Sequence, residues 1–328
     1  MKGSVGKDIF AKMGYELVLL GFLAIWFLFM GVMEHSFLAL NNIVTVLTRV
    51  SEVAIIAVGM TVVIIAGGFD LSVGTVMAIV PIIIGLSYGN GFPFGVCIFY
   101  GILSAVAIGI VNGILIAKAG FQPIIGTLAT MTALRSIIYV LTDGKPVSTF
   151  PSGYDQLAQG KLLGIPIPIL ILLAIIIAAQ WMMRCTKYGR FIYATGGNPK
   201  ATDIAGISVV RITIAVYVLN ALLAGVAGII FSSRLISASP DAGRNTAFDV
   251  VTAVLMGGTS INGGQGNILG TMLGILILNF IINGFNLLGV NAYWQMIFMG
   301  IVLLIAIGYD AKLRNGFDIA KFFKHRKG

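Results

Sequence analysis

Long apolar runs, separated by short polar stretches, follow one another along almost the whole chain. A run of about 20 apolar residues crosses the hydrocarbon of a bilayer as an α-helix, whereas a membrane β-barrel shows alternating segments of about ten residues. Such alternation is absent here, so the pattern predicts an all-α, polytopic transmembrane helix bundle of about ten spans. The expected spans are 15–33, 51–66, 71–89, 95–117, 123–142, 166–183, 212–232, 246–257, 267–287 and 292–309.

Two of these spans, 51–66 and 246–257, are too short to cross as straight helices, and each runs into a glycine cluster. The clusters read GGFDLSVG from Gly67 and GGTSINGGQG from Gly257, and a helix restarts after each with a similar pattern, GTVM or GTML. Glycine-broken segments in corresponding halves are typical of transporters built from internal repeats. The candidates for the translocation path or gate are Gly67, Gly68, Asp70, Ser72, Gly74, Gly257 and Gly258.

Composition excludes an independent soluble domain. Hydrophobic residues make up 58% of the chain and charged residues 10%, against about 25% charged residues in soluble domains. No linker divides the chain, so residues 1–328 are predicted to form a single transmembrane domain. The run at 15–33 is too long for a cleavable signal and is interpreted as the first span.

The basic residues predict the orientation. Although the formal net charge is +9, the Lys and Arg residues flank apolar spans rather than form a face with interleaved aromatics, which argues against nucleic acid. With both termini inside, about 15 of the 21 Lys and Arg residues are cytoplasmic and about 5 external, as the positive-inside rule expects. This places loop 184–211 in the cytoplasm and the turn-rich loop 143–165 outside.

Asp70 is the most informative single residue, because a carboxylate in the hydrocarbon costs several kcal/mol unless it is paired or wetted. One interpretation is that Asp70 or Ser72 caps the restarting helix by accepting its free N–H groups. The alternatives are a contact with the cargo and a role in a gate or helix contact.

Other polar residues also fall in or near spans. Arg135 either pairs with a carbonyl group or lines a polar pathway. Arg234 and Arg244 belong to an external loop, which is either simply solvated or a docking surface for an external binding protein. Five asparagines are expected to join helices, with a ligand contact as the alternative. They are Asn112, Asn220, Asn279, Asn283 and Asn286.

The side-chain sets of common enzymes are missing. The two histidines, His35 and His325, fall outside the spans, which leaves none in the bundle for a metal or a catalytic base. No phosphate-binding GxxxxGK[ST] loop occurs either. The chain is therefore expected to be non-catalytic, without a metal or cofactor of its own, and any ATP hydrolysis requires another polypeptide.

Four stretches resemble one known family, the permease subunits of bacterial ABC importers for monosaccharides, in particular its ribose-type branch. They are Gly67–Gly74, Thr186–Ile207, Gly257–Gly266 and NGFNLL from Asn283 with YWQM from Tyr293. One departure is Ala247, where relatives commonly carry Glu, while Asp249 is kept; no role is assigned to an acidic pair there.

The resemblance implies a pore of two identical or related permease copies, a cytoplasmic ATPase pair that uses ATP and Mg, and an extracytoplasmic sugar-binding protein. It also implies that loop 184–211 contains the segment that seats on the ATPase. The residues concerned are Gly189, Arg190, Gly196, Gly197, Asn198, Ala201 and Gly206.

The predicted function is thus import of a pentose or hexose across the bacterial cell membrane, the inner one in a Gram-negative cell, by alternating access. One alternative is a secondary carrier driven by H⁺ or Na⁺, with Asp70 as the coupling site. Another is an intramembrane enzyme, which the missing histidines disfavour. The sequence does not name the sugar, because selectivity rests with the binding protein.

Overall fold

The structure, a computed structural model, describes residues 2–315, with side chains for residues 16–308; His325 and the basic residues near it lie outside the described part. Nearly all elements are helices. They are α1 (Lys2–Met33), the 3-10 helix η1 (His35–Leu38), α2 (Leu40–Ile65), α3 (Val73–Gly89), α4 (Phe94–Ala117), α5 (Pro123–Thr142), α6 (Gln156–Gln159), α7 (Ile167–Cys185), α8 (Lys187–Gly197), α9 (Pro199–Ile204), α10 (Val209–Leu235), α11 (Thr246–Met256), α12 (Ile268–Leu287) and α13 (Ala292–Asn315). Strands β1 (Lys161–Leu162) and β2 (Ile165–Pro166) pair as one antiparallel hairpin.

Seven helices are long and apolar enough to cross a membrane among the described residues: α1, α2, α4, α5, α7, α10 and α12. The apolar parts of α3, α11 and α13 described here are shorter. The predicted polytopic helical membrane protein is therefore confirmed, whereas the count of ten spans is not.

The prediction of a short span at 51–66 is wrong. Helix α2 is continuous over 26 residues, and its polar N-terminal half had suggested a loop. The polar groups there are satisfied within the bundle or along the helix. Asn42 and Asn283 of α12 exchange two hydrogen bonds of 3.0 Å, and the Thr45 hydroxyl donates to the Asn41 carbonyl at 2.7 Å. The short span predicted at 246–257 is present as α11, with 11 residues.

Helix α2 lies at the centre of the bundle and is buried over most of its length, as is α3. In α1, α4, α5 and α7, by contrast, fewer than a quarter of the residues are buried; Val140 of α5, for example, is 79% exposed. Lipid is as apolar as these side chains, so helices in contact with lipid need no polar outer face. Inside, small residues allow close approach: a Cβ atom at Gly228 of α10 would strike the Met77 carbonyl of α3.

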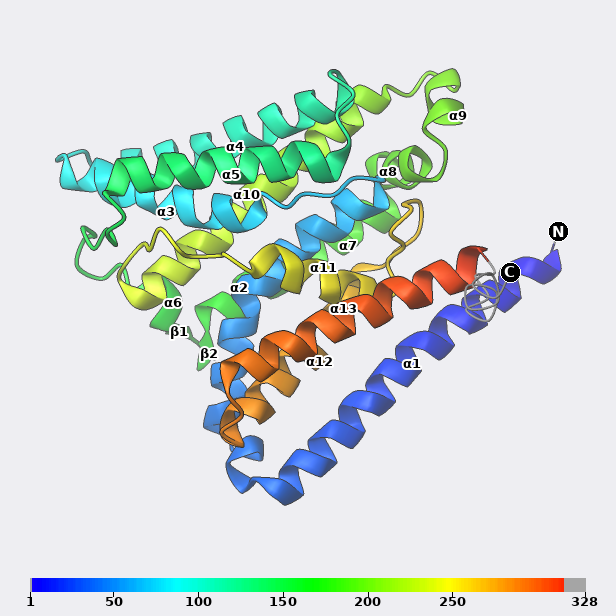
Figure 1. Ribbon diagram of the computed structural model, residues 1–328, viewed down its shortest axis with the longest axis horizontal. Coiled ribbons are helices and arrows are strands. Elements are labelled where there is room, and N and C mark those ends of the chain that lie inside the picture. Colours follow the sequence, from blue (N-terminus) through cyan, green and yellow to red (C-terminus); the bar gives the residue numbers. More distant parts are fainter. Residues whose placement is uncertain (1, 316–328) are drawn as a thin grey trace, which may run out of the picture.

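Two non-helical segments lead into the shorter helices, α3 with 17 residues and α11 with 11. Residues 66–72 connect α2 to α3, and residues 236–245 connect α10 to α11. Figure 1 shows these segments entering from opposite ends of the molecule, so that α3 and α11 both begin in its middle. There the backbones of Gly74 and Gly243 touch, and a Cβ atom on either would strike the carbonyl oxygen of the other. The helices α3 and α11 therefore meet near their N-termini inside the bundle.

The two ends of the molecule carry different structures. Helices α8 and α9 lie on the right of Figure 1, the side on which α1 begins, while α6 and the β1–β2 hairpin lie on the left. Loop 143–165 is packed onto α10 rather than extended: the Tyr154 hydroxyl lies 2.6 Å from the Ser232 hydroxyl, and the Ser233 hydroxyl accepts from the Ala158 N–H at 3.1 Å.

Candidate functional site

Asp70 is fully buried in the segment between α2 and α3, where three donors reach its carboxylate. Its Oδ1 atom accepts from the Ser72 N–H at 3.0 Å and from the Ser72 hydroxyl at 2.6 Å, and its Oδ2 accepts from Asn220 of α10 at 3.0 Å. Asn112 of α4 donates in turn to the Ser72 hydroxyl at 2.8 Å. The carboxylate thus connects the start of α3 to α10 directly and to α4 through Ser72. Asn220 and Asn112 join helices here, as expected from the sequence.

The predicted helix cap is not found in its simple form. Ser72 occupies the cap position of α3, but its side chain accepts no helix N–H, and Asp70 accepts the N–H of Ser72 itself rather than one within the helix. The reason is that both side chains are engaged in a local turn and in the amides of α4 and α10. Asp70 fixes the turn that starts α3.

Side chains of neighbouring helices satisfy the backbone of segment 66–72. The Phe69 carbonyl accepts from the Tyr217 hydroxyl of α10 at 2.9 Å, and the Leu71 N–H donates to the Thr127 hydroxyl of α5 at 3.1 Å. Non-helical backbone inside a membrane protein requires such partners, because lipid offers none. Sequence analysis did not single out Tyr217 or Thr127; their hydroxyls within apolar runs were the available signal.

Arg135 supports the other non-helical segment in the same way. Its Nη1 atom donates to the Pro240 carbonyl and, at 2.9 Å, to the Ala242 carbonyl, just before α11 begins. Of the two roles considered for Arg135, the geometry matches pairing with carbonyl groups.

The segment predicted to contact an ATPase consists of α8 and α9, each with a side-chain cap. The Thr186 hydroxyl accepts from the Gly189 N–H at 3.3 Å, and Asn198 Oδ1 accepts from the Ala201 N–H at 3.0 Å. Among the predicted contact residues, Gly189 is buried and Gly196 is half-buried. The others are exposed: Arg190, Gly197, Asn198, Ala201 and Gly206.

The end of α8 contacts both glycine breaks, at a place that we name the glycine junction, formed by Gly67, Gly196, Gly197, Gly263 and Gly264. The Gly264 N–H donates to the Ile65 carbonyl at the end of α2, 2.8 Å away. A Cβ atom at Gly196 would strike the same carbonyl, and one at Gly263 would lie 2.9 Å from the Gly67 Cα atom. The backbones are therefore in direct contact, and α8 cannot shift here without moving the breaks.

The remaining predicted gate glycines also lie at close contacts. A Cβ atom at Gly68 would lie 2.8 Å from the Tyr217 hydroxyl, and one at Gly257 would lie 2.5 Å from the Gly270 backbone of α12. Gly258 adopts a φ of +83°, a left-handed conformation that favours glycine. The break after α11 thus depends on its glycines for both space and backbone conformation.

The two arginines predicted for docking differ in their surroundings. Arg234 forms a two-pronged ion pair with Glu52 of α2, with Nε 2.7 Å and Nη2 3.1 Å from the two carboxylate oxygens. Glu52 is 3% exposed, and sequence analysis missed it although it is a carboxylate within an apolar run. Arg244 is exposed and lies 3.4 Å from the Asp241 carboxylate. A docking role remains a prediction for both.

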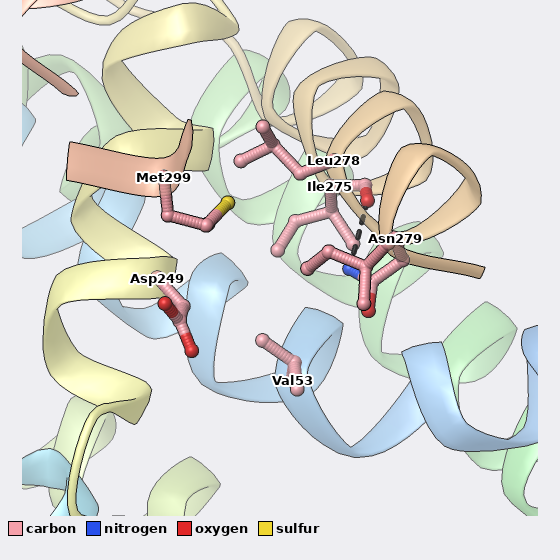
Figure 2. Close-up of a pocket in the computed structure, with 7 residues that line it drawn as sticks. Val53, Asp249, Ile275, Leu278, Asn279 and Met299 are labelled. Carbon is pink, nitrogen blue, oxygen red and sulfur yellow. Dashed lines mark hydrogen bonds between the residues drawn. The ribbon is translucent and has the colours of Figure 1, made fainter. Parts of the chain in front are cut away.

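A small cavity opens beside Asp249 of α11 (Figure 2). Its lining includes Asn279 of α12, Val53 of α2 and Met299 of α13, and its volume is about 40 Å³. The described residues contain no group of three His, Cys, Asp or Glu side chains that could hold a metal ion.

Residues 42–307 match the family described as branched-chain amino acid transport system / permease component. The chain belongs to this family of transport permeases. The match includes every candidate residue discussed above, and it makes the chain a multi-pass membrane permease, a class of subunit that is not catalytic itself.

Three curated relatives refine the comparison. The ribose import permease protein RbsC of Escherichia coli (strain K12) is 43% identical over 284 residues, 85% of this chain and 88% of that protein. RbsC of Bacillus subtilis (strain 168) is 40% identical over 86% of this chain and 88% of its own length. The D-allose transport system permease protein AlsC of E. coli (strain K12) is 31% identical over 86% and 87%. No solved structure matches the chain. The ribose-type resemblance inferred from the motifs is confirmed.

Proposed function

We propose that this chain is the permease subunit of an ABC importer that carries a monosaccharide, a pentose or hexose, into the cytoplasm. The observation that carries the proposal is the similarity to two ribose permeases and a D-allose permease over more than four fifths of the chain. The partners would be a cytoplasmic ABC ATPase that uses ATP and Mg, an extracytoplasmic sugar-binding protein and a second permease copy.

The exposed surface of α8 and α9 suits a soluble ATPase. Tyr188 is 56% exposed and Ile204 is 88% exposed, beside the exposed Arg190. Apolar side chains next to a cation at one end of a membrane bundle favour docking of a protein partner. We therefore assign this end to the cytoplasm, together with both termini.

In this orientation the chain has ten membrane segments. Helices α3, with 17 residues, and α11, with 11, are the shorter ones, and the non-helical segments 66–72 and 236–245 would complete their passages. Movement of α8 by the ATPase would reach both glycine breaks through the glycine junction, because the backbones touch there. Alternating access would follow from displacement of α3 and α11, whose starts lie beside the contact between Gly74 and Gly243.

The ion-coupled carrier is disfavoured by the environment of Asp70. Both carboxylate oxygens already accept hydrogen bonds, from Ser72 and Asn220, so the structure gives Asp70 a role in holding helices together. An intramembrane enzyme is disfavoured by membership in a permease family.

The test is affinity purification of the tagged chain from its native membrane, followed by reconstitution in proteoliposomes. We expect an ABC ATPase to co-purify with the chain. We also expect the proteoliposomes to take up ribose or another monosaccharide in an ATP-dependent manner when the binding protein is supplied. Gly197→Trp is the matched variant: a Cβ atom at Gly197 meets no atom within 4 Å, so the ring would project from the surface. We expect it to insert normally but to lose the ATPase. Purification without an ATPase, or a Gly197→Trp complex as stable as the wild type, would contradict the assignment.

A further inference from the structure

The cavity beside Asp249 lies where four helices meet. Asp249 belongs to the first turns of α11, and Asn279, Ile275 and Leu278 belong to α12, with Val53 of α2 and Met299 of α13 completing the lining. In Figure 2 the Asp249 carboxylate points toward the space between these helices, with Asn279 on its far side. Two polar side chains thus face an otherwise apolar cavity.

Asp249, which is half-buried, differs from the fully buried acidic residues Asp70 and Glu52. Asp70 accepts from three donors and Glu52 holds Arg234, whereas the Asp249 carboxylate has no hydrogen bond or ion pair within residues 16–308. A charge in a transmembrane segment is costly when it is unpaired. The nearby N-terminus of α11 favours the negative charge, but it supplies no N–H to the side chain.

The Asn279 side chain adds a second acceptor oxygen that receives no hydrogen bond. Its Nδ2 atom donates to the Ile275 carbonyl of the same helix at 2.9 Å, which leaves Oδ1 without a hydrogen bond in the described part of the chain. The cavity therefore presents acceptor oxygens from both side chains, whereas its one side-chain donor, the Asn279 NH₂ group, already uses one of its two hydrogens. A ligand that fits must bring its own donors, and hydroxyl groups on an apolar carbon frame meet both requirements.

We propose that Asp249 and Asn279 form a contact on the translocation path that accepts hydrogen bonds from the hydroxyl groups of the passing sugar. This inference rests on the proposed function. A metal cation suits the cavity less well, because the lining supplies only two oxygen-bearing side chains among apolar ones.

The size of the cavity indicates a transient contact rather than a tight site. A volume of about 40 Å³ holds roughly three water molecules, less than a whole sugar ring. The cavity would accept one or two hydroxyl groups, or widen when α11 moves. Because α11 ends at the break that contains Gly263 and Gly264, motion at the glycine junction would reach the cavity directly.

The test compares ATP-driven uptake of ribose and of its monodeoxy analogues by reconstituted complexes that carry Asp249→Asn or Asp249→Leu. We expect Asp249→Leu to lower ribose uptake about tenfold, the loss typical of one hydrogen bond to a charged group. The uptake of at least one monodeoxyribose should fall much less, because that analogue already lacks the hydroxyl group that donates to the Asp249 carboxylate. For each sugar, the uptake rate of the variant is divided by that of the wild type. The sugar preferences of the binding protein therefore cancel. Asp143→Asn, at an exposed carboxylate, is the control and should leave all rates unchanged.

If Asp249 had only a structural role, Asp249→Leu would lower the uptake of all sugars by the same factor. That result would overturn the inference, and so would unchanged uptake of ribose. Failure of the wild-type complex to import any monosaccharide would instead refute the proposed function.

A second measurement uses Asp249→Cys in a Cys185→Ser background, which removes the exposed native thiol and retains the buried Cys97. We expect a small, polar thiol reagent to label the new cysteine and ribose to slow the labelling during turnover. Labelling that ribose does not affect, or a disulfide between two permease copies at this position, would contradict a sugar contact.

Discussion

At Asp70 a buried carboxylate is held by Ser72 and Asn220, while Asn112 donates to the Ser72 hydroxyl, and the amides around it are not all satisfied. The Oδ1 atoms of Asn112 and Asn220 are buried without a hydrogen-bond partner in the described part of the chain. Asn220 therefore has an unused acceptor beside the carboxylate to which it donates. This arrangement determines how the site should respond to loss of charge.

We expect Asp70→Asn to be mild. The new amide oxygen can still accept from the Ser72 N–H and hydroxyl, and a rotated Asn220 amide could present its unused oxygen to the new NH₂ group. Asp70→Leu should be severe, because it leaves buried donors of Ser72 and Asn220 unpaired, at about 1–3 kcal/mol for each group. Uptake and thermal stability of both purified complexes, normalised to inserted protein, provide the measurement. An assembled but inactive Asp70→Asn complex would indicate that the charge itself is needed.

Single residues were partly predictable from sequence. Asp70 could be recognised because a carboxylate after two glycines in an apolar chain is unusual. Its partner Asn220 lies 150 residues away, and only the packing of α10 against α3 brings the two together. Glu52 and Arg234, 182 residues apart, were missed as a pair for the same reason.

Among the elements, the breaks were predicted more reliably than the helix lengths. Glycine clusters identified both interruptions, since a left-handed φ such as that of Gly67, +84°, strongly favours glycine. The start of α2 was misjudged because hydropathy counts Asn42 and Thr45 as polar, whatever hydrogen-bond partners they have. The contact of α8 with both breaks was not predictable, because it depends on three segments that are distant in sequence.

The glycine junction makes a testable distinction between adjacent residues of α8. Gly196→Ala should weaken the structure by about 1–3 kcal/mol, because the added methyl group meets the Ile65 carbonyl and the Gly264 backbone. Gly197→Ala adds the same methyl group where no atom lies within 4 Å and should leave stability unchanged. Thermal unfolding of both variants in detergent measures the difference. If they unfold at the same temperature, α8 does not contact the breaks as described.

For the whole molecule, the fold class followed from composition, but the orientation rests on charge and on the placement of α8 and α9. Loop 184–211 and loop 143–165 lie at different ends of the bundle, with the lipid-facing helices between them (Figure 1). The positive-inside rule assigns the basic loop 184–211 to the cytoplasm, and docking of an ATPase on α8 and α9 requires the same side. Both arguments would fail together if the orientation were reversed.

Cysteine labelling in intact cells tests this orientation. Lys200→Cys and Ser148→Cys, each in the Cys185→Ser background, place thiols at exposed positions of the two loops. We expect a membrane-impermeant reagent to reach the Ser148 position from outside and the Lys200 position only after the membrane is opened. Ile177→Cys is the matched control: Ile177 is 69% exposed in the middle of the apolar helix α7, where a thiol in lipid stays protonated and poorly reactive, so neither condition should label it. Labelling of the Lys200 position in intact cells would show that the topology is the reverse of the one assigned. Helices α8 and α9 would then lie outside the reach of any cytoplasmic ATPase.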